Sequence, residues 1–424
     1  MRTFARFCLS IGATVLFAGC ALPLSLSKGQ DDTQLPIGTP ATVPQMQTVA
    51  GRASSPPYQV LYQFDGASGY FPAAPLIDVN GTLYGTTRDG GGGHGVVYSI
   101  TTDGHEKVLH SFSGGSADGQ DPAAGLLDVN GTLYGTTTEG GGNDCGTVYS
   151  ISRSGKEKVL YSFRGGQRGF DGCSPWAPLI DVNGTLFGTT QLGGHGNGTV
   201  FSISTEGIEK VLYRFSRHNA DGRGPWGGLV DVSGRLYGTT SLGGGCFRGG
   251  CGTVYSISTS GLEKVLYRFR GGSTDGATPI GGLIAVKGTL YGTTYSGGSS
   301  ACNKTCGTVY SVTIQGTEKV LHYFARSDGA KPHAGLIFAN GTLYGTTRRG
   351  GSGTGCLFGH NSGCGTVFSV SKSGVERVLH SFAGDSDGGN PVASLVDVNG
   401  TLYGTTANHL LHEDAVSTAF ALTP

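Results

Sequence analysis

An all-β fold, a seven-bladed β-propeller of four-stranded antiparallel blades, is predicted by three observations on this sequence. The stretch Leu-Tyr-Gly-Thr-Thr occurs seven times, once with phenylalanine for tyrosine, starting at Leu83, Leu133, Leu186, Leu236, Leu290, Leu343 and Leu402. Successive copies start 50, 53, 50, 54, 53 and 59 residues apart, and a period near 50 is the size of a four-stranded blade. Between the copies, short runs of Val, Ile, Leu, Tyr and Thr alternate with glycine-rich breaks and show no helical periodicity.

Each repeat contains four such runs, and the second copy predicts where its strands lie. They are expected at residues 124–129, 132–137, 146–151 and 157–163. Asn130-Gly131 joins the first two strands, and this pair suits a type I′ turn because both positions need a positive φ. We therefore interpret the recurring Asn-Gly-Thr triplets as turn chemistry and not as glycosylation acceptors.

The two ends of the array are expected to share one blade. Residues 58–64 match only a fourth strand, whereas residues 391–422 supply the first three strands. An N-terminal strand that completes the C-terminal blade leaves no free sheet edge at the join. We therefore expect the propeller to cover residues 58–424, with its ring closed by the N-terminal strand.

Residues 1–20 have the features of an export signal. A short basic start and an apolar run precede residues 17–20, Phe-Ala-Gly-Cys, which are similar to a bacterial lipoprotein cleavage box. Cys20 would then carry the lipid; the alternative is an ordinary secretory signal with an incidental cysteine. Residues 21–57 are too poor in apolar side chains to fold and are expected to form a disordered tether. The predicted location is the bacterial envelope, at the outer membrane or cell surface, or outside the cell, with membrane contact through the lipid anchor alone.

The charge balance argues against nucleic acid as a partner. Lys plus Arg equals Asp plus Glu, at 29 each, and only 14% of residues are charged. A neutral chain offers no basic footprint for a phosphate backbone. We expect a monomer without a cofactor. We also expect no metal, because the loop histidines at 94, 195, 218 and 360 show no ligand spacing.

Eight cysteines follow the signal region, and an exported protein is expected to pair them. Three pairs fall within single loops between second and third strands: Cys246 with Cys251, Cys302 with Cys306, and Cys356 with Cys364. Cys145 has no local partner, but Cys173 lies in the next interblade connection, and both loop types emerge on one face of a blade. Zinc ligation is the alternative, although the spacings differ and bring no paired histidines.

The loops after the second strands vary in length and content, which indicates the face where function is expected. The side chains in them that are most able to contact a ligand are Phe247, Arg248, Lys304, Phe358, His360 and Asn361. The alternative is that exposed loops simply tolerate changes in length.

An Asp-Gly pair precedes the blade-opening proline by four residues in six interblade connections. The aspartates are Asp118, Asp171, Asp221, Asp275, Asp328 and Asp387. A ring of carboxylates can hold calcium or protonate a glycosidic oxygen. We favour a turn role instead, in which each aspartate accepts a downstream backbone N–H and the glycine takes positive φ. We likewise interpret the recurrent Glu-Lys pairs, such as Glu106-Lys107, as solvated strand ends.

Two tryptophans break the symmetry of the repeats. Trp176 and Trp226 each follow a blade-opening proline, where other copies have Ala, Ile, His or Val. If first strands line the central channel, the two indoles stand side by side at its mouth, where they suit a sugar ring or an apolar ligand. The alternative is that they fill the channel entrance as packing.

The repeat unit, with Gly-Thr-Val-Tyr-Ser-Ile, Gly-x-Glu-Lys-Val-Leu-Tyr-x-Phe, Asp-Gly-x-x-Pro and Leu-Ile-Asp-Val-Asn-Gly-Thr-Leu-Tyr-Gly-Thr-Thr, resembles the GloVer tandem repeat. The match covers residues 58–424, and blocks 128–137 and 181–190 agree almost residue for residue. The blade plan also resembles a kelch-type blade, without the kelch signature. The resemblance implies an exported, surface-anchored bacterial protein and supplies no catalytic residues. The seventh copy departs from the pattern at residues 407–416.

Two classes of function are compatible with these observations. The preferred hypothesis is a non-catalytic, surface-anchored module that binds a glycan or a protein on its variable-loop face, because no nucleophile, base and orienting group can be assembled. The alternative is a carbohydrate-active enzyme in which Trp176 and Trp226 hold a sugar and Asp171 or Asp221 acts as acid or base. A third hypothesis is a purely structural envelope component.

Overall fold

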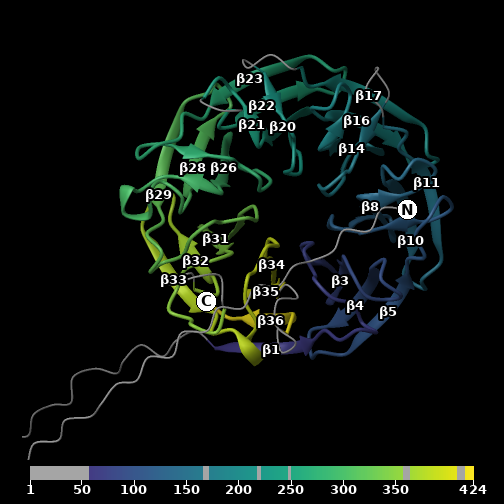
Figure 1. The fold of residues 1–424 in the computed structure, drawn as a ribbon, viewed down its shortest axis with the longest axis horizontal. Helices are drawn as coiled ribbons and strands as arrows, with labels where there is room; N and C mark the ends of the chain where they lie inside the picture. The colour runs from purple at the N-terminus through teal and green to yellow at the C-terminus, as the bar shows by residue number, and fades with distance from the viewer. Residues whose placement is uncertain (1–56, 166–170, 217–220, 247–249, 357–362, 408–415) are drawn as a thin grey trace, which may run out of the picture. The chain divides into compact units, whose positions relative to one another are not determined.

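The structure is a computed structural model that describes residues 57–165, 171–216, 221–246, 250–356, 363–407 and 416–424. These residues form seven sheets of four antiparallel strands arranged in a ring (Figure 1). The predicted signal at 1–20, Cys20 within it, and the tether except for Pro57 lie outside the described residues. Within the described ranges, no helix is long and apolar enough to cross a membrane.

The first three blades follow one plan, with consecutive strands paired from the channel outwards. Blade 1 consists of β2 (Ile77–Val79), β3 (Thr82–Thr87), β4 (Val96–Thr101) and β5 (Glu106–Ser111). Blade 2 consists of β7 (Leu127–Val129), β8 (Thr132–Thr137), β10 (Thr147–Ser152) and β11 (Glu157–Ser162). Blade 3 consists of β13 (Ile180–Val182), β14 (Thr185–Thr190), β16 (Thr199–Ser204) and β17 (Glu209–Arg214).

The next three blades repeat this plan. Blade 4 consists of β19 (Val230–Val232), β20 (Arg235–Thr240), β22 (Thr253–Ser258) and β23 (Glu263–Arg268). Blade 5 consists of β25 (Ile284–Val286), β26 (Thr289–Thr294), β28 (Thr308–Thr313) and β29 (Glu318–Tyr323). Blade 6 consists of β30 (Ile337–Ala339), β31 (Thr342–Thr347), β32 (Thr366–Val370) and β33 (Glu376–Ser381).

Blade 7 confirms the predicted ring closure. Its strands are β34 (Val396–Val398), β35 (Thr401–Thr406), β36 (Thr418–Leu422) and β1 (Tyr58–Gln63). β1 pairs antiparallel with β36, so that Tyr58 lies opposite Leu422 and Gln63 opposite Thr418. In Figure 1 the purple N-terminal strand lies along the outside of the yellow C-terminal strands. β36, which would otherwise be an unpaired edge at the join, is thus paired with β1, as the sequence predicts.

First strands are shorter than predicted. In blade 2 the ladder includes Leu127–Val129 and not residues 124–126. The Ala124 carbonyl instead accepts a hydrogen bond of 3.2 Å from the Thr86 hydroxyl of blade 1. A Cβ at Gly125 would lie 2.8 Å from Pro75, so this segment also passes too close to its neighbour for a larger residue. The start of each first strand is therefore used for contact between blades.

The repeated pentapeptide is explained by packing on both sides of the second strand. Its leucine is buried, as at Leu83. Its glycine leaves room for the aromatic ring of the third strand, since a Cβ at Gly85 would lie 2.5 Å from the Tyr98 hydroxyl. In blades 2 to 7 the second threonine bonds to the threonine that opens the third strand, and the Thr137 and Thr147 hydroxyl oxygens are 2.9 Å apart.

The first threonine of the pentapeptide joins neighbouring blades. Its hydroxyl donates to a carbonyl at the start of the next blade, as between Thr293 and Ala334 at 2.8 Å. The same bond closes the ring, where Thr405 donates to the Pro72 carbonyl at 2.9 Å. The exception is Thr189, whose buried hydroxyl has no partner in the described part of the chain.

The hydrophobic core lies between adjacent blades and not within one blade. One cluster combines Tyr84, Val97 and Phe112 of blade 1 with Leu133 and Tyr149 of blade 2. The rings of Phe112 and Tyr149 meet edge to face, with centroids 5.2 Å apart. An isolated blade would therefore leave much of its apolar surface exposed, which is the usual reason why such repeats need their neighbours.

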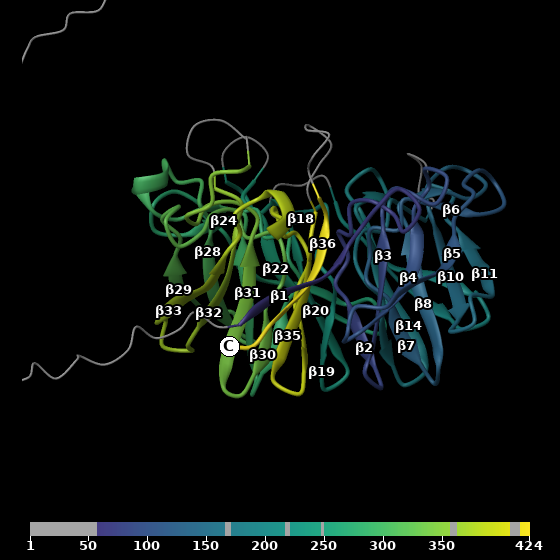
Figure 2. The same ribbon diagram turned by 90° about the horizontal axis from the view of Figure 1, so that it is seen from below.

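The two faces of the ring differ in construction. One face carries the uniform hairpins between first and second strands (Figure 2), in which Asn130 and Gly131 take φ of 52° and 85°, as a type I′ turn requires. The other face carries the loops after second strands and the interblade connections. Four short two-stranded pairings join these two loop types: β6 (Gly119–Gln120) with β9 (Glu139–Gly140), β12 (Gly172–Cys173) with β15 (Leu192–Gly193), β18 (Gly222–Arg223) with β21 (Leu242–Gly243), and β24 (Gly276–Ala277) with β27 (Ser296–Gly297). Two 3₁₀ helices, η1 (Ser300–Cys302) and η2 (Asp385–Asp387), lie in the same loop types.

All four predicted disulfides are present on this loop face. Three close single loops, and Cys145–Cys173 joins the loop before β10 to the connection that follows blade 2. The eight cysteines are thus paired as the sequence predicts.

Candidate functional site

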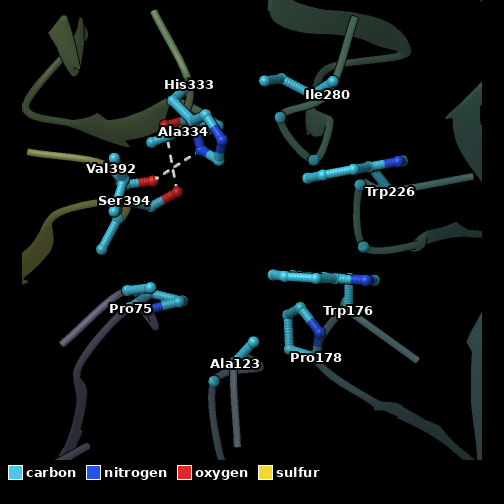
Figure 3. Close-up of a pocket in the computed structure, with 18 of the residues that line it drawn as sticks. Pro75, Ala123, Trp176, Pro178, Trp226, Ile280, His333, Ala334, Val392 and Ser394 are labelled. Carbon is cyan, nitrogen blue, oxygen red and sulfur yellow. Dashed lines mark hydrogen bonds between the residues drawn. The ribbon is translucent and has the colours of Figure 1, made fainter. Parts of the chain in front are cut away.

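A cavity of about 490 Å³ lies where the first strands meet at the loop face. Each blade contributes the segment around its opening proline, so the lining residues come from equivalent positions. Figure 3 shows Pro75, Ala123, Trp176, Trp226, Ile280, His333 and Val392 around this cavity. The chemical character of the mouth therefore depends on a few positions at which the repeats differ.

The two tryptophans form one aromatic surface at this mouth. The rings of Trp176 and Trp226 stack with centroids 5.0 Å apart and an interplanar angle of 14°. Both are half-buried and line the cavity. They lie side by side at the channel mouth, as the sequence predicts, and leave part of their surface open to a ligand.

Arg88 also lines the cavity, and its charge is already paired. Its Nε and one terminal nitrogen each lie 2.6 Å from a carboxylate oxygen of Asp121. The guanidinium also lies 4.7 Å from the ring centroid of Trp176 and 5.3 Å from that of Phe71. Arg88 thus fixes the wall of the mouth beside Trp176 by a bidentate ion pair and a cation–π contact.

His333 is a neutral polar group at the mouth. Burial, followed by the charge of Arg348, lowers the pKa of His333 to about 4. Its Nδ1 lies 3.3 Å from the Val392 carbonyl, and since a carbonyl only accepts, Nδ1 carries the proton. Nε2 is then an acceptor, able to take a hydrogen bond from a ligand hydroxyl.

Arg348 is the second arginine of the lining. Its Nε is buried and has no hydrogen-bond partner among the described residues. Its backbone N–H donates to the Lys331 carbonyl at 3.2 Å. Sequence reasoning missed Arg88, His333 and Arg348, although each breaks the repeat at a position equivalent to smaller or neutral residues elsewhere.

The interblade aspartates lie apart from this cavity. Asp221 accepts bonds from the Ser216 N–H at 2.9 Å, the Gly222 N–H at 2.8 Å and the Tyr213 hydroxyl at 3.0 Å. Asp171 accepts the N–H groups of Arg164 and Gly165 and the Tyr161 hydroxyl. These carboxylates therefore end a fourth strand and shape the connection, and neither lines the cavity beside the tryptophans.

The role predicted for the glycine of each Asp-Gly pair is only partly right. Gly329 and Gly388 take positive φ, but Gly119 and Gly276 do not. A Cβ at Gly119 would lie 2.4 Å from the Thr137 side chain, so close packing against the second strand excludes a larger residue.

The glutamates of the Glu-Lys pairs are not solvated as predicted. Glu157, Glu209 and Glu263 are half-buried at the start of fourth strands, and one carboxylate oxygen of each is buried without a partner in the described chain. Burial, followed by the charge of the nearest interblade aspartate, raises the pKa of each to about 7. The signal in the sequence is that this glutamate recurs in every complete copy, which an ordinary solvated surface residue does not require.

At two of the contacts between neighbouring blades, which we call seams, these glutamates lie close to a histidine. His110, Asp118 and Glu157 form one group and His322, Asp328 and Glu376 the other, with ligand atoms within 4.8 Å of one another in each. His322 Nε2 lies 3.1 Å from an Asp328 oxygen. The same three positions hold Tyr213, Asp221 and Glu263 between blades 3 and 4, so this arrangement belongs to the architecture of the seam.

Of the residues predicted in the variable loops, the structure describes Lys304, which does not line the cavity. Lys304 is exposed, in the loop closed by the Cys302–Cys306 disulfide. Phe247, Arg248, Phe358, His360 and Asn361 lie outside the described residues.

Comparison with known proteins identifies the family of these repeats. The family model described as Gloeobacter/Verrucomicrobia repeat matches residues 45–251 and 247–424. No curated protein matches the chain. Among solved structures, the chain is similar to the computationally designed Ika8 protein, with 13% identity, a TM-score of 0.45, and coverage of 85% of this chain and 99% of that one. The chain belongs to the Gloeobacter/Verrucomicrobia repeat family.

Proposed function

We propose that this protein is a non-catalytic binding module that holds a sugar ring against Trp176 and Trp226 at the channel mouth. The single observation that carries the proposal is the stacked pair of indoles beside a cavity of about 490 Å³. Ligand sites are typically concave and apolar, with a few polar groups that fix orientation. The flat apolar face of a sugar fits an indole, and its hydroxyls fit acceptors such as His333 Nε2.

Binding without turnover is supported by the chemistry of the lining. The polar side chains that line the cavity are arginine, histidine and serine, and the Ser394 hydroxyl already donates to the Gly335 carbonyl at 3.1 Å. Asp171 and Asp221, the acid–base candidates, are bonded at strand ends.

The proposed setting is the bacterial envelope, with the protein exported as a monomer and held by a lipid on Cys20. The four disulfides support an oxidising compartment. The lipid is tested by labelling cells with a fatty-acid probe: wild-type protein should incorporate it and Cys20→Ala should not.

The sugar site is tested with a glycan array, using the full chain with its disulfides oxidised. We expect saturable binding that falls at least tenfold in the Trp176→Ala, Trp226→Ala double variant, a loss of about 1.4 kcal/mol. Phe338→Ala is the control, because Phe338 is 37% exposed and lies outside the cavity. Equal binding by the double variant and the wild type would exclude the mouth as the sugar site.

A further inference from the structure

Arg88 and Arg348 occupy the same repeat position, directly after the second threonine of the pentapeptide, in blades 1 and 6. Both line the cavity. They differ in their surroundings, because the side chain of Arg88 reaches Asp121, the residue directly before the proline that opens blade 2. The corresponding residue before blade 7 is Asn390, which precedes Pro391. The position that holds the carboxylate of Asp121 for Arg88 is therefore occupied by the neutral amide of Asn390 for Arg348.

The backbone confirms that these positions correspond. Asp121 and Asn390 take φ of 58° and 53°. The Asp121 carbonyl accepts a bond from Thr138 N–H at 3.0 Å, and the Asn390 carbonyl accepts one from Ala407 N–H at 3.4 Å. The difference between the two sites thus comes from the side chains, with the local chain path preserved.

The charge of Arg348 is not compensated within the described chain. No ion pair to its side chain is formed there, and its buried Nε has no hydrogen-bond partner. A buried donor left unbonded is destabilising, and more so when the group is charged. A ligand anion in the cavity would remove this cost, whereas Arg88 is already satisfied by Asp121.

We infer that the mouth recognises an acidic sugar, whose carboxylate pairs with Arg348 while its ring lies on the indoles. This inference rests on the proposed sugar site and adds the charge of the ligand. A planar guanidinium matches a carboxylate through two parallel hydrogen bonds. His333 is neutral and lines the same cavity, so it can bind a hydroxyl without competing for the anion.

The test compares an oligogalacturonate with its methyl ester, which keeps the ring and removes the charge. Binding to the full chain is measured by calorimetry at neutral pH. The wild type is expected to bind the acid at least tenfold more tightly than the ester, and this preference should shrink as salt is raised. Equal affinity for acid and ester would overturn the inference and leave the sugar site standing; no binding of either would count against both.

Two variants test whether the unpaired charge of Arg348 causes the preference for the acid. Arg348→Gln should bind acid and ester equally, at the affinity that the wild type shows for the ester. Asn390→Asp keeps the arginine but supplies the carboxylate that Arg88 already has, and it should also lose the preference for the acid. Aspartate fits this backbone, since Asp121 adopts the same φ. A retained preference in both variants would show that Arg348 is not the receptor.

Benzoate distinguishes a sugar acid from an aromatic acid. We expect benzoate to bind at least tenfold more weakly than the oligogalacturonate, since it has no hydroxyl for His333. Benzoate binding that equalled the oligogalacturonate would reassign the ligand as an aromatic carboxylate.

Discussion

The ring of Tyr58 lies flat on the ring of His380, with centroids 3.8 Å apart and planes within 3° of parallel. The Tyr58 hydroxyl also donates to the Asp387 carbonyl at 2.9 Å. Tyr58 stands where the other blades carry the half-buried glutamate, because it opens the fourth strand of blade 7. One side chain at the start of the closing strand thus fastens blade 7 to blade 6.

Replacing Tyr58 by alanine should destabilise the closed ring by about 2 kcal/mol, because a half-buried aromatic ring and its hydrogen bond are lost. The midpoint of urea unfolding is the measurement. Ile208→Ala is the control, since Ile208 is 75% exposed and should change little. An unchanged midpoint for Tyr58→Ala would show that β1 does not limit the stability of the ring.

The hydroxyl of Thr405 should matter more than that of Thr189. Thr405→Val removes the 2.9 Å bond to Pro72 and leaves a buried carbonyl with one partner fewer, which costs about 1–2 kcal/mol. Thr189→Val keeps the same repeat position and shape but removes a hydroxyl that has no partner in the described chain, so it should be neutral or stabilising. The two free energies of unfolding are compared directly, and equal losses would contradict the interblade role of this threonine.

Lys287→Asn should stabilise the hairpin of blade 5 by about 0.5–1 kcal/mol. Lys287 takes φ of 50° at the turn position where five blades have asparagine, a residue that tolerates this conformation better. The reverse change, Asn340→Lys in blade 6, should destabilise by a similar amount. Thermal unfolding of both variants tests this, and shifts of the same sign would rule out the turn explanation.

The seam glutamates should make stability depend on pH. The pKa of Glu157 is about 7 in the folded protein and its ordinary value is 4.5. Its contribution to stability is complete below pH 4.5 and is lost as the pH rises towards 7, because the unfolded chain ionises first.

Glu157→Gln should therefore stabilise the protein at pH 8 by about 1 kcal/mol, a value reduced for solvent screening, and leave it unchanged near pH 4. Unfolding free energies at both pH values are the measurement. Glu206→Gln is the control, because Glu206 is exposed. A gain that was the same at both pH values would mean that ionisation of Glu157 is not the cause.

The repeat made the fold predictable from sequence, including the closing strand and the pairing of Cys145 with Cys173. A seven-fold count and a missing fourth strand leave few topologies open, and the two cysteines fall in loop types that share a face. The adjacency of Trp176 and Trp226 followed from the same logic, since they hold one repeat position in neighbouring blades.

Three polar residues that line the cavity, Arg88, His333 and Arg348, were not predictable in this way. Arg88 begins one of the loops that vary in length between the repeats. The bidentate bond to Asp121, 33 residues later, holds the Arg88 guanidinium against Trp176. The seam glutamates were misjudged because a charged residue next to lysine is usually exposed, and only the ring brings the neighbouring blade close enough to bury one.

The Thr423 N–H donates to the Pro57 carbonyl at 3.2 Å, so the two ends of the folded ring are one hydrogen bond apart. A short glycine linker should join them without straining either strand. The ring can then be opened elsewhere, for example at the Asn340-Gly341 hairpin turn, which lies on the face away from the cavity. Such circular permutants would keep the tryptophan pair in place while moving the chain ends to any chosen blade.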